Sequence, residues 1–329
     1  MSPRVACLPG DCIGPEVMAV AQRVLGVLTP DVELAEHLFG ADAIRQTGDS
    51  LPPDTLEACR SADAVLKAPI GHPEFDAADV RPEQGMLRLR AELDVYANLR
   101  PAREGAIDLV IVRELVGGLY FGARGVRDDG TVFDTCEYHP SQVERLARRG
   151  FELARTRGRK LTSVDKANVL ETSRLWRRVV RDVSADYPDV EVEDMLVDNA
   201  AMQLASAPEQ FDVVVTENMF GDILSDLAAA MTGGLGLAPS ASLGDRGPGI
   251  FEPVHGSAPD IAGRGIANPT GMLRSTVLML EHGLGRPAEA VALTQAVEGA
   301  LATTPTRDLG GTATTAEFSD AVVGALERT

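Results

Sequence analysis

The sequence predicts an α/β protein whose central sheet is covered by helices on both faces. Short runs of β-branched and other apolar residues recur along the chain, and segments with helical apolar spacing lie between several of them. Such alternation is typical of parallel sheets that are buried on both sides. A chain of 329 residues is also long enough to bury a large core, in one large or two medium domains.

The elements follow in order from the N-terminus. Arg4–Leu8 is the first predicted strand, and Pro15 then stands where a first helical turn tolerates proline. Apolar residues from Val17 to Leu28 continue at helical spacing. The further predicted strands are Ala64–Leu66, Asp108–Arg113, Lys160–Asp165, Val190–Asp198 and Phe211–Glu217, and further helices are predicted over Pro140–Arg157 and Asn168–Val183.

The segment 232–271 differs from the rest of the chain, because its 40 residues contain ten glycines and five prolines. Surface connections would explain it, but a long loop without secondary structure of its own is usually functional or disordered. Its aliphatic residues and few charges favour a binding loop. Elsewhere, Asp128-Asp129-Gly130 predicts a hairpin turn, either of a plain exposed hairpin or of an arm that holds a partner.

Charge and cysteine usage exclude several classes of protein. A formal charge of −18 disfavours nucleic acid and anionic membranes as main partners, because both require a basic surface. The four cysteines form no C-x-x-C pair, which argues against a zinc site or a disulfide scaffold. No secretory signal or membrane-spanning stretch is visible, so we expect a soluble cytoplasmic protein. The chain also lacks G-x-G-x-x-G, P-loop and G-x-S-x-G motifs.

One pair of acidic residues suggests a metal site. Asp222 and Asp226 are four residues apart on a predicted helix, which places their side chains on one face, about 5–6 Å apart. Two like charges there are unfavourable unless a cation lies between them, and Mg²⁺ takes such oxygen ligands. A solvated acidic face is the commoner explanation of an isolated pair. The apolar and alanine-rich neighbours make that explanation less suitable here.

The basic residues of interest are Arg90, Arg100, Arg113 and Lys166. Arg113 and Lys166 follow apolar runs at the carboxyl ends of predicted strands, where α/β sheets bind ligands. Arginines in such places suit carboxylate binding, although each taken singly is more often a surface ion-pair partner. Tyr120 follows two glycines and is either a core phenol or a catalytic residue.

Long motifs occur in order along nearly the whole chain and together resemble a known family. The family is that of the metal-dependent β-decarboxylating dehydrogenases, which includes enzymes acting on isocitrate, isopropylmalate, homoisocitrate and tartrate or D-malate. The motifs are GDCIGPEV (10–17), EQGMLRLRAELDVYANLRP (83–101), VRELVGGLYFG (112–122), VDKANVLETSRLWR (164–177), VDNAAMQL (197–204), TENMFGDILSDLAA (216–229), EPVHGSAPDIAGRGIANPT (252–270) and DLGG (308–311).

This resemblance implies ligands for the substrate and for a metal. Arg90, Arg100 and Arg113 would bind the carboxylates of the malate part of the substrate. Mg²⁺ or Mn²⁺ would be held by three carboxylates, of which one comes from the neighbouring subunit of a homodimer. These metal ligands would be Asp222, Asp226 and the partner subunit's Asp198.

The resemblance also implies an acid and a base. Lys166, again from the neighbouring subunit, would take the proton of the substrate hydroxyl, which requires a lowered pKa. Tyr120 would protonate the enol that remains after CO₂ leaves. A catalytically silent homologue would not need both groups, so their presence argues against that alternative.

The glycine- and proline-rich run would bind the dinucleotide. Asp260 would accept hydrogen bonds from the ribose hydroxyls and repel a 2′-phosphate, which predicts NAD⁺ as the cofactor. The implied cofactor-binding residues are Ile13, His255, Gly256, Ser257, Ala258, Asp260, Ile261 and Asn268.

The implied fold is the α/β/α fold of this family, not a Rossmann fold, with two domains that share a large mixed sheet. Residues 1–95 and 234–329 would form the first domain, with the nucleotide-binding loops. Residues 96–233 would form the second, with the metal residues, the dimer contacts and an intersubunit arm near 122–140.

The substrate is expected to be (2R,3S)-3-isopropylmalate, oxidised and decarboxylated to 4-methyl-2-oxopentanoate in leucine biosynthesis. Its variable group would face Glu83, Met86 and Leu87, and an apolar pair there suits an isopropyl group. D-Malate, tartrate or another 3-alkylmalate is the alternative, possibly in specialised metabolism, because one methylene changes discrimination by only about 1–3 kcal/mol.

Three departures from the isopropylmalate pattern bear on this expectation. Cys12 replaces a glycine and would strain its loop if the backbone φ angle is positive there. Val116 stands where threonine is usual, and the stretch from Leu66 to Gly71 is closer to archaeal isocitrate enzymes.

Overall fold

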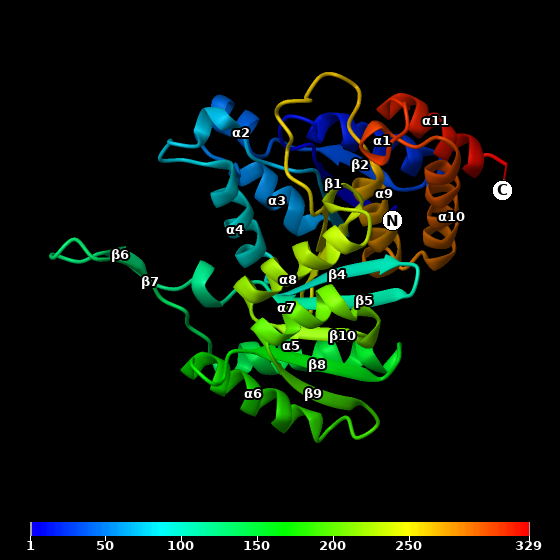
Figure 1. The fold of residues 1–329 in the computed structure, drawn as a ribbon. Helices are drawn as coiled ribbons and strands as arrows, with labels where there is room; N and C mark the ends of the chain where they lie inside the picture. Colours follow the sequence, from blue (N-terminus) through cyan, green and yellow to red (C-terminus); the bar gives the residue numbers. More distant parts are fainter. Residues whose placement is uncertain (1, 329) are drawn as a thin grey trace. The chain divides into compact units, whose positions relative to one another are not determined.

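The computed structural model of the chain describes residues 2–328 (Figure 1). Its backbone divides into two compact units. Unit 1 comprises residues 1–93 and 235–329, and unit 2 comprises residues 94–234.

Unit 1 contains five strands in the order β2-β1-β3-β12-β11. β1 runs parallel to β2 and β3, β12 runs parallel to β3, and β11 pairs antiparallel with β12. The strands are β1 Arg4–Leu8, β2 Glu33–Glu36, β3 Ala64–Lys67, β11 Pro239–Leu243 and β12 Gly249–Pro253, and the helices are α1 Gly14–Leu28, α2 Ala41–Thr47, α3 Pro53–Ser61, α4 Pro82–Glu92, α9 Thr270–Leu278, α10 Pro287–Thr303 and α11 Thr315–Leu326.

The first helix shows why the local sequence is sufficient to predict the first elements of the fold. Pro15 lies in the first turn of α1, and the helix buries Val17, Ala21 and Val24 at the spacing of one helical face. The predicted first strand is confirmed to the residue, because β1 spans Arg4–Leu8 and is buried from Val5 onward.

The glycine- and proline-rich segment is not one long loop. Its middle forms the antiparallel pair of β11 and β12, which is largely buried and packs against α9. Short strands separated by glycine and proline turns have the composition of a loop, so composition alone hides them. The longest part without helix or strand is residues 254–269, between β12 and α9.

Unit 2 contains the strand order β4-β5-β10-β8-β9 and a separate hairpin of β6 and β7. β4 and β5 are antiparallel, whereas β5, β10, β8 and β9 are parallel. The strands are β4 Ala97–Glu104, β5 Ile107–Glu114, β6 Arg124–Val126, β7 Val132–Asp134, β8 Lys160–Asp165, β9 Glu191–Leu196 and β10 Val213–Thr216, and the helices are α5 Pro140–Arg155, α6 Glu171–Ser184, α7 Val197–Ser206 and α8 Asn218–Met231.

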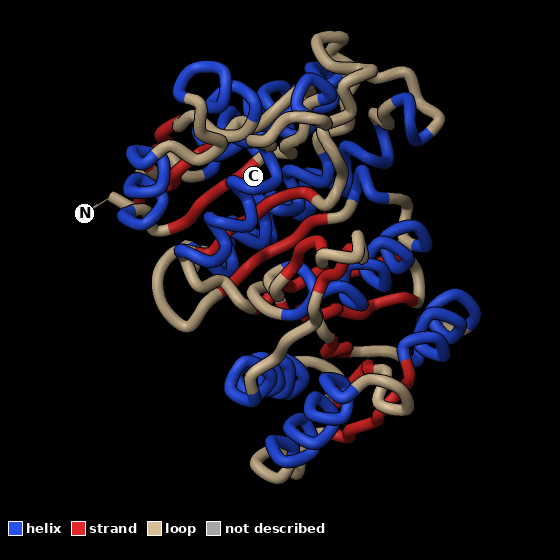
Figure 2. The backbone as a smooth tube through the Cα atoms, turned by 90° about the vertical axis from the view of Figure 1, so that its left-hand side faces the viewer, coloured by secondary structure: helices blue, strands red, loops and turns tan. Residues whose placement is uncertain are grey.

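The main sheet of unit 2 is covered on both faces, as predicted. Val214 of β10 lies in one core cluster with Leu204 of α7 and Leu224 of α8. Its neighbour Val215 packs against Gly150 of α5. Successive residues of a strand point to opposite faces, so α7 and α8 cover one face and α5 the other. Figure 2 shows helices flanking the strands in this way.

The predicted strand Val190–Asp198 is wrong at its end. β9 stops at Leu196, and Asp198 lies in the first turn of α7. The alternating pattern of a strand ends there, and Ala200 and Leu204 are then buried at helical spacing. A carboxylate in a first turn is also stabilised by the helix dipole.

The predicted hairpin turn is confirmed. β6 and β7 pair antiparallel around the segment Arg127–Thr131, and Gly130 has a φ of 84°. The hairpin extends away from the rest of unit 2 (Figure 1).

No helix within residues 2–328 is long and apolar enough to span a membrane.

Candidate active site

Five of the predicted site residues come together within unit 2. Arg100 lies on β4 and Arg113 on the neighbouring strand β5, while Tyr120 ends the short 3-10 turn that follows β5. Asp222 and Asp226 lie one turn apart on α8, which packs against both strands. The fold therefore gathers two cations, two carboxylates and a phenol from three parts of the chain.

Both carboxylates of α8 face arginine. Arg100 donates to Asp226 Oδ1 at 3.2 Å and lies 3.4 Å from Asp222 Oδ1. Arg113 makes a short hydrogen bond to the same oxygen of Asp222, and the Tyr120 hydroxyl donates to Oδ2 of Asp222 at 3.0 Å. Arg100 is therefore the cation between the two acids that their helical spacing required.

The cations of this cluster are less exposed than the carboxylates, and the Arg100 side chain is 11% exposed. The side chain of Arg113 is 2% exposed, whereas those of Asp222 and Asp226 are 34% and 50% exposed. Burial raises the pKa of Asp226, which Arg100 opposes. Burial and the charge of Asp222 raise the pKa of Tyr120, so the phenol keeps its proton at neutral pH. Fixed cations beside accessible carboxylates suit an anionic ligand together with a hard cation.

Asp222 and Asp226 fit Mg²⁺ or Mn²⁺ as two of its ligands, because both carboxylates already point at one cationic group, the Arg100 guanidinium. Within residues 2–328, no three His, Cys, Asp or Glu side chains form a metal-binding group.

Lys166 and Asp198 form a separate pair. Lys166 follows β8, and its Nζ makes a short ion pair with Asp198 Oδ1 at the start of α7. This hydrogen bond lowers the pKa of Asp198. The assignment of both residues to the site of a neighbouring subunit stays a prediction.

In unit 1, Arg90 on α4 is held by a fully buried carboxylate. Arg90 Nη2 donates to Glu252 Oε1 at 3.1 Å, and Lys67 Nζ lies 2.7 Å from Glu252 Oε2. Burial alone would raise the pKa of Glu252, but Lys67 and Arg90 lower it to about 2. Two cations thus share one anion. The Nε atom of Arg90 is buried and has no hydrogen-bond partner within the described chain.

The residues predicted to face the variable group of the substrate differ in exposure. Glu83 is exposed and Leu87 is half-buried on α4, whereas Met86 is 6% exposed and belongs to the core. Leu87 is therefore the main apolar side chain that α4 offers to a ligand.

The predicted nucleotide loop, residues 254–269, is tied to two other loops of unit 1. Ile13 N donates to Ser257 O at 3.0 Å, and Ser257 Oγ donates to Gly71 O at 2.6 Å. Asp11, 4% exposed, accepts from Gly71 N and Ala41 N at 2.8 Å each. These loops follow the parallel neighbours β1, β3 and β12, and α/β proteins bind ligands at such carboxyl ends.

Side chains of the nucleotide loop differ in how they are engaged. Burial lowers the pKa of His255, so its imidazole is neutral at pH 7, and its buried Nε2 has no partner within the described chain. Asp260 is exposed, next to the half-buried Ile261. Asn268 is already engaged, because it donates to Asp308 Oδ2 at 2.9 Å and accepts from Thr270 N. The loop thus leaves an imidazole nitrogen and a carboxylate open to a ligand.

Backbone conformation explains two further features of these loops. Ala258 has a φ of 44°, which is unusual for a residue other than glycine. Cys12 has a φ of 54°, so the condition for strain at this glycine replacement is met.

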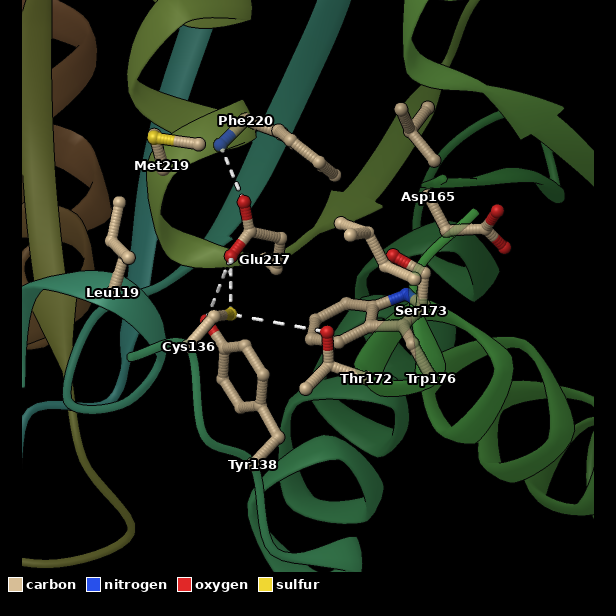
Figure 3. A pocket seen from close by; sticks show the side chains of 12 residues that line it. Leu119, Cys136, Tyr138, Asp165, Thr172, Ser173, Trp176, Glu217, Met219 and Phe220 are labelled. Atoms are coloured by element: carbon tan, nitrogen blue, oxygen red, sulfur yellow. Dashed lines mark hydrogen bonds between the residues drawn. The ribbon is translucent and has the colours of Figure 1, made fainter. Parts of the chain in front are cut away.

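A cavity of about 200 Å³ lies in unit 2 (Figure 3), but none of its lining residues is a predicted site residue. Its walls include Leu119, Trp176 and Phe220. Glu217 accepts hydrogen bonds from Phe220 N at 2.9 Å and from the Tyr138 hydroxyl at 3.3 Å. The cavity is therefore a neighbour of the arginine and carboxylate cluster, not the cluster itself.

Sequence reasoning missed the buried polar residues that hold the site. Asp11, Glu114, Asn218 and Glu252 are all buried. They all lie inside the quoted motifs, and a buried polar residue must find partners. The location of these polar residues inside the motifs was the signal in the sequence that could have identified them.

Comparisons with known proteins agree with the geometry. Residues 4–322 match the family model described as isocitrate/isopropylmalate dehydrogenase. A 3-isopropylmalate dehydrogenase of Zymomonas mobilis subsp. mobilis is 50% identical, over 98% of this chain and 99% of the relative. One from Pseudomonas putida is 48% identical over 99% of each chain. The solved isocitrate dehydrogenase of Methylococcus capsulatus superposes with a TM-score of 0.91 at 36% identity, over 98% of this chain and 99% of that one.

Proposed function

The chain belongs to the isocitrate/isopropylmalate dehydrogenase family, and on that premise we propose that it oxidises and decarboxylates (2R,3S)-3-isopropylmalate with NAD⁺ and Mg²⁺ or Mn²⁺. The product would be 4-methyl-2-oxopentanoate, as a step of leucine biosynthesis in the cytoplasm. The names of the relatives support the substrate, and the site residues support the chemistry.

The observation that carries the proposal is the cluster of Arg100, Arg113, Tyr120, Asp222 and Asp226. Its two arginines, of which Arg113 is buried and Arg100 partly buried, match the carboxylates of a hydroxy diacid and would orient them by bidentate hydrogen bonds. Its two accessible carboxylates are the natural ligands of a divalent cation. A binding protein for a diacid would need the arginines but not the neighbouring phenol.

Proton movements are assigned to two side chains. The partner subunit's Lys166 takes the proton of the substrate hydroxyl during oxidation, and Tyr120 supplies a proton to the carbon from which CO₂ has left. The raised pKa of Tyr120 keeps that proton in place until it is needed. When bound by Asp222 and Asp226, the divalent ion supplies Lewis acidity that stabilises negative charge on the substrate oxygens.

The proposed dinucleotide is NAD⁺ and not NADP⁺. Asp260 is exposed in the loop 254–269, where its carboxylate can accept two ribose hydroxyls and would repel a phosphate. The buried Nε2 atom of the neutral His255, which has no partner within the described chain, is a proposed acceptor for the same ligand.

A homodimer is part of the proposal, because Lys166 and Asp198 are paired apart from the main cluster. The helices α7 and α8 pack together and expose Met202 (59%) and Ile223 (60%). Large exposed apolar side chains on the helices that carry Asp198 and Asp222 favour a second copy as their cover. The β6–β7 hairpin is the proposed arm.

A substrate with a smaller variable group is the second candidate. The burial of Met86 leaves Leu87 as the main apolar side chain of α4 toward a ligand, which favours a diacid such as D-malate more than the sequence alone did.

The test is NADH formation in the presence of Mg²⁺ with 3-isopropylmalate, isocitrate, D-malate and tartrate. We expect the highest kcat/KM with 3-isopropylmalate and none of this activity in EDTA. Preference for D-malate would replace the first candidate by the second, and no turnover with any diacid would refute the proposed reaction.

Replacing one metal ligand tests the site directly. Asp222→Asn should lower kcat/KM at least about 100-fold and raise the Mg²⁺ concentration for half-maximal rate. The variant should remain folded, since Asp222 is partly exposed and Arg113 keeps its hydrogen bonds to Asn218. Asp320→Asn, which removes an exposed ion pair with Arg23, is the control and should leave turnover unchanged. An Asp222→Asn variant with normal Mg²⁺ dependence would contradict the assignment.

A further inference from the structure

Asn218 connects two functional parts of unit 2. It is the first residue of α8 and only 1% exposed. Its Oδ1 atom accepts from Arg113 Nη2 at 2.8 Å and from Arg113 Nε at 3.1 Å. Its Nδ2 atom donates to Gly117 O at 3.0 Å, just before the turn that carries Tyr120. One buried amide thus contacts both an arginine and the turn that leads to the phenol.

The arginine contact fixes the plane of the guanidinium without neutralising it. Nε and Nη2 of Arg113 are held by the neutral amide oxygen, and Nη1 is directed at Asp222. A carboxylate in place of this amide would compensate the positive charge. The amide keeps that charge available to an anionic ligand while it orients the side chain.

The contact to Gly117 fixes the turn before Tyr120 from one side. Glu114 holds the same segment from the other side, since it accepts from Gly117 N at 2.8 Å and Val116 N at 3.0 Å. The Gly117 residue is therefore bound at both its amide and its carbonyl. Such double anchoring determines where the following residues, and with them Tyr120, are placed.

Asn218 is itself held by the structure around the cavity in Figure 3. Its backbone N donates to the Tyr138 hydroxyl at 3.0 Å, and Tyr138 donates to Glu217. Glu217 also caps α8 by accepting from Phe220 N. The amide is thus fixed by the helix start and by the aromatic wall beside it.

We propose that Asn218 is a positioning residue that sets the orientation of Arg113 for the substrate carboxylate and the placement of Tyr120 for proton donation. This rests on the proposed function, because it assigns Arg113 to a hydroxy diacid. Asn218 contacts neither substrate nor cofactor itself and acts through the two residues it holds.

Asn218→Asp is the discriminating variant. It preserves size and an acceptor for Arg113, but it neutralises that arginine and loses the donor to Gly117 O. A new acid at the start of α8 is favoured by the helix dipole, which supports folding of the variant. We expect the Kd of 3-isopropylmalate, measured by calorimetry with Mg²⁺ and without dinucleotide, to rise at least about tenfold. The kcat should fall as well, while the KM of the dinucleotide stays within twofold.

Thr216→Val is the matched control. Thr216 is fully buried two residues before Asn218, and its hydroxyl donates to Val164 O at 2.9 Å. Thr216 is the cross-strand neighbour of Arg113, but this variant removes no hydrogen bond of Arg113 or of the Tyr120 turn. It should lower the melting temperature but leave substrate Kd and kcat within twofold of the wild type.

The outcomes separate this proposal from the proposed function. The positioning role alone would be overturned if kcat and substrate Kd were the same in the wild type and Asn218→Asp. It would also be overturned if Thr216→Val changed kcat and Kd as much as Asn218→Asp does. Substrate binding by the wild type without turnover would refute only the proposed reaction, because the Kd comparison still tests Asn218. If Asn218→Asp does not fold, the neutral Asn218→Ser should show the same split, with weaker substrate binding and unchanged dinucleotide binding.

Discussion

Each unit holds an arginine that is predicted to bind the substrate, but the two units hold their arginines by different means. Arg90 of unit 1 is bound to Glu252, which is fully buried and shared with Lys67. Arg113 of unit 2 is bound to the amide of Asn218 and to Asp222, whose side chain is 34% exposed. The counter-ion is permanent in unit 1 and accessible in unit 2.

This difference distinguishes an ion group that stabilises the fold from one that is proposed to take part in the reaction. Glu252 has no path to exchange its partners, because both of its oxygens are occupied inside the protein. The Asp222 side chain is 34% exposed, and in the proposed function a metal ion replaces its arginine contacts. Changes at the buried ion group should therefore affect the whole fold, and changes at the accessible one should affect the reaction.

The largest expected effect is that of Glu252→Gln. Removing the one anion leaves the buried Lys67 and the partly buried Arg90 without compensation, and breaking a buried ion pair typically costs about 3–5 kcal/mol. We expect the free energy of unfolding from urea titration to fall by that amount. Glu298→Gln, in the exposed pair with Arg274 of the same unit, should cost less than about 1 kcal/mol. Equal losses in the two variants would remove the distinction between permanent and accessible counter-ions.

The second effect concerns pH, where the two units should respond with opposite sign. The pKa of Glu252 is lowered to about 2, so its stabilising contribution is present above the unfolded value of 4.5 and is lost as pH falls toward 2. Burial raises the pKa of Glu114 in unit 2 to about 7, so folding favours its protonated form. The contribution of Glu114 to the free energy of unfolding is fully present below pH 4.5. It is lost as the pH rises from 4.5 to about 7.

Urea unfolding of two variants as a function of pH measures this contrast. The stability difference between the wild type and Glu252→Gln should shrink below pH 4.5, whereas that between the wild type and Glu114→Gln should shrink from pH 4.5 to 7. The slopes should not exceed about 1.4 kcal/mol per pH unit for one group. Slopes of the same sign in both variants would contradict the assignment.

The smallest expected effect is a gain in stability from Cys12→Gly. Cys12 has a φ of 54° in a loop of unit 1, and an L-residue there costs about 1–2 kcal/mol relative to glycine. Glycine also gains entropy when the chain unfolds, so the net increase should be about 0.5–1 kcal/mol. A small rise in melting temperature is the expected reading, and a decrease would show that the Cys12 side chain contributes more than its strain costs.

Local pattern was sufficient for several parts of the fold and of the site. The bounds of β1 and β8 match the predicted strands, because apolar runs of that length are bounded by helix and turn signals. The pair Asp222 and Asp226 lies on a helix as predicted, because their spacing and the alanine-rich run after them specify helix.

Partners that are distant in sequence could not be predicted. Lys67 and Glu252 meet because β12 lies beside β3, and that strand order is a property of the tertiary structure. Asn218 reads as an ordinary residue at a helix start, and only the fold places Arg113 and Gly117 against its amide. The predicted strand Val190–Asp198 is longer than β9 because a strand pattern that runs directly into a helix has no glycine or proline to mark its end.

The β6–β7 hairpin has a consequence for solubility. Val126 and Val132 face each other in register and are 69% and 73% exposed, on a ribbon of two strands with open edges. Such an edge is a template for aggregation. The hairpin also carries an Arg124–Asp134 ion pair and an Arg127 guanidinium over the ring of Phe133. These charges flank the exposed valines and oppose edge-to-edge pairing of the hairpin with another chain.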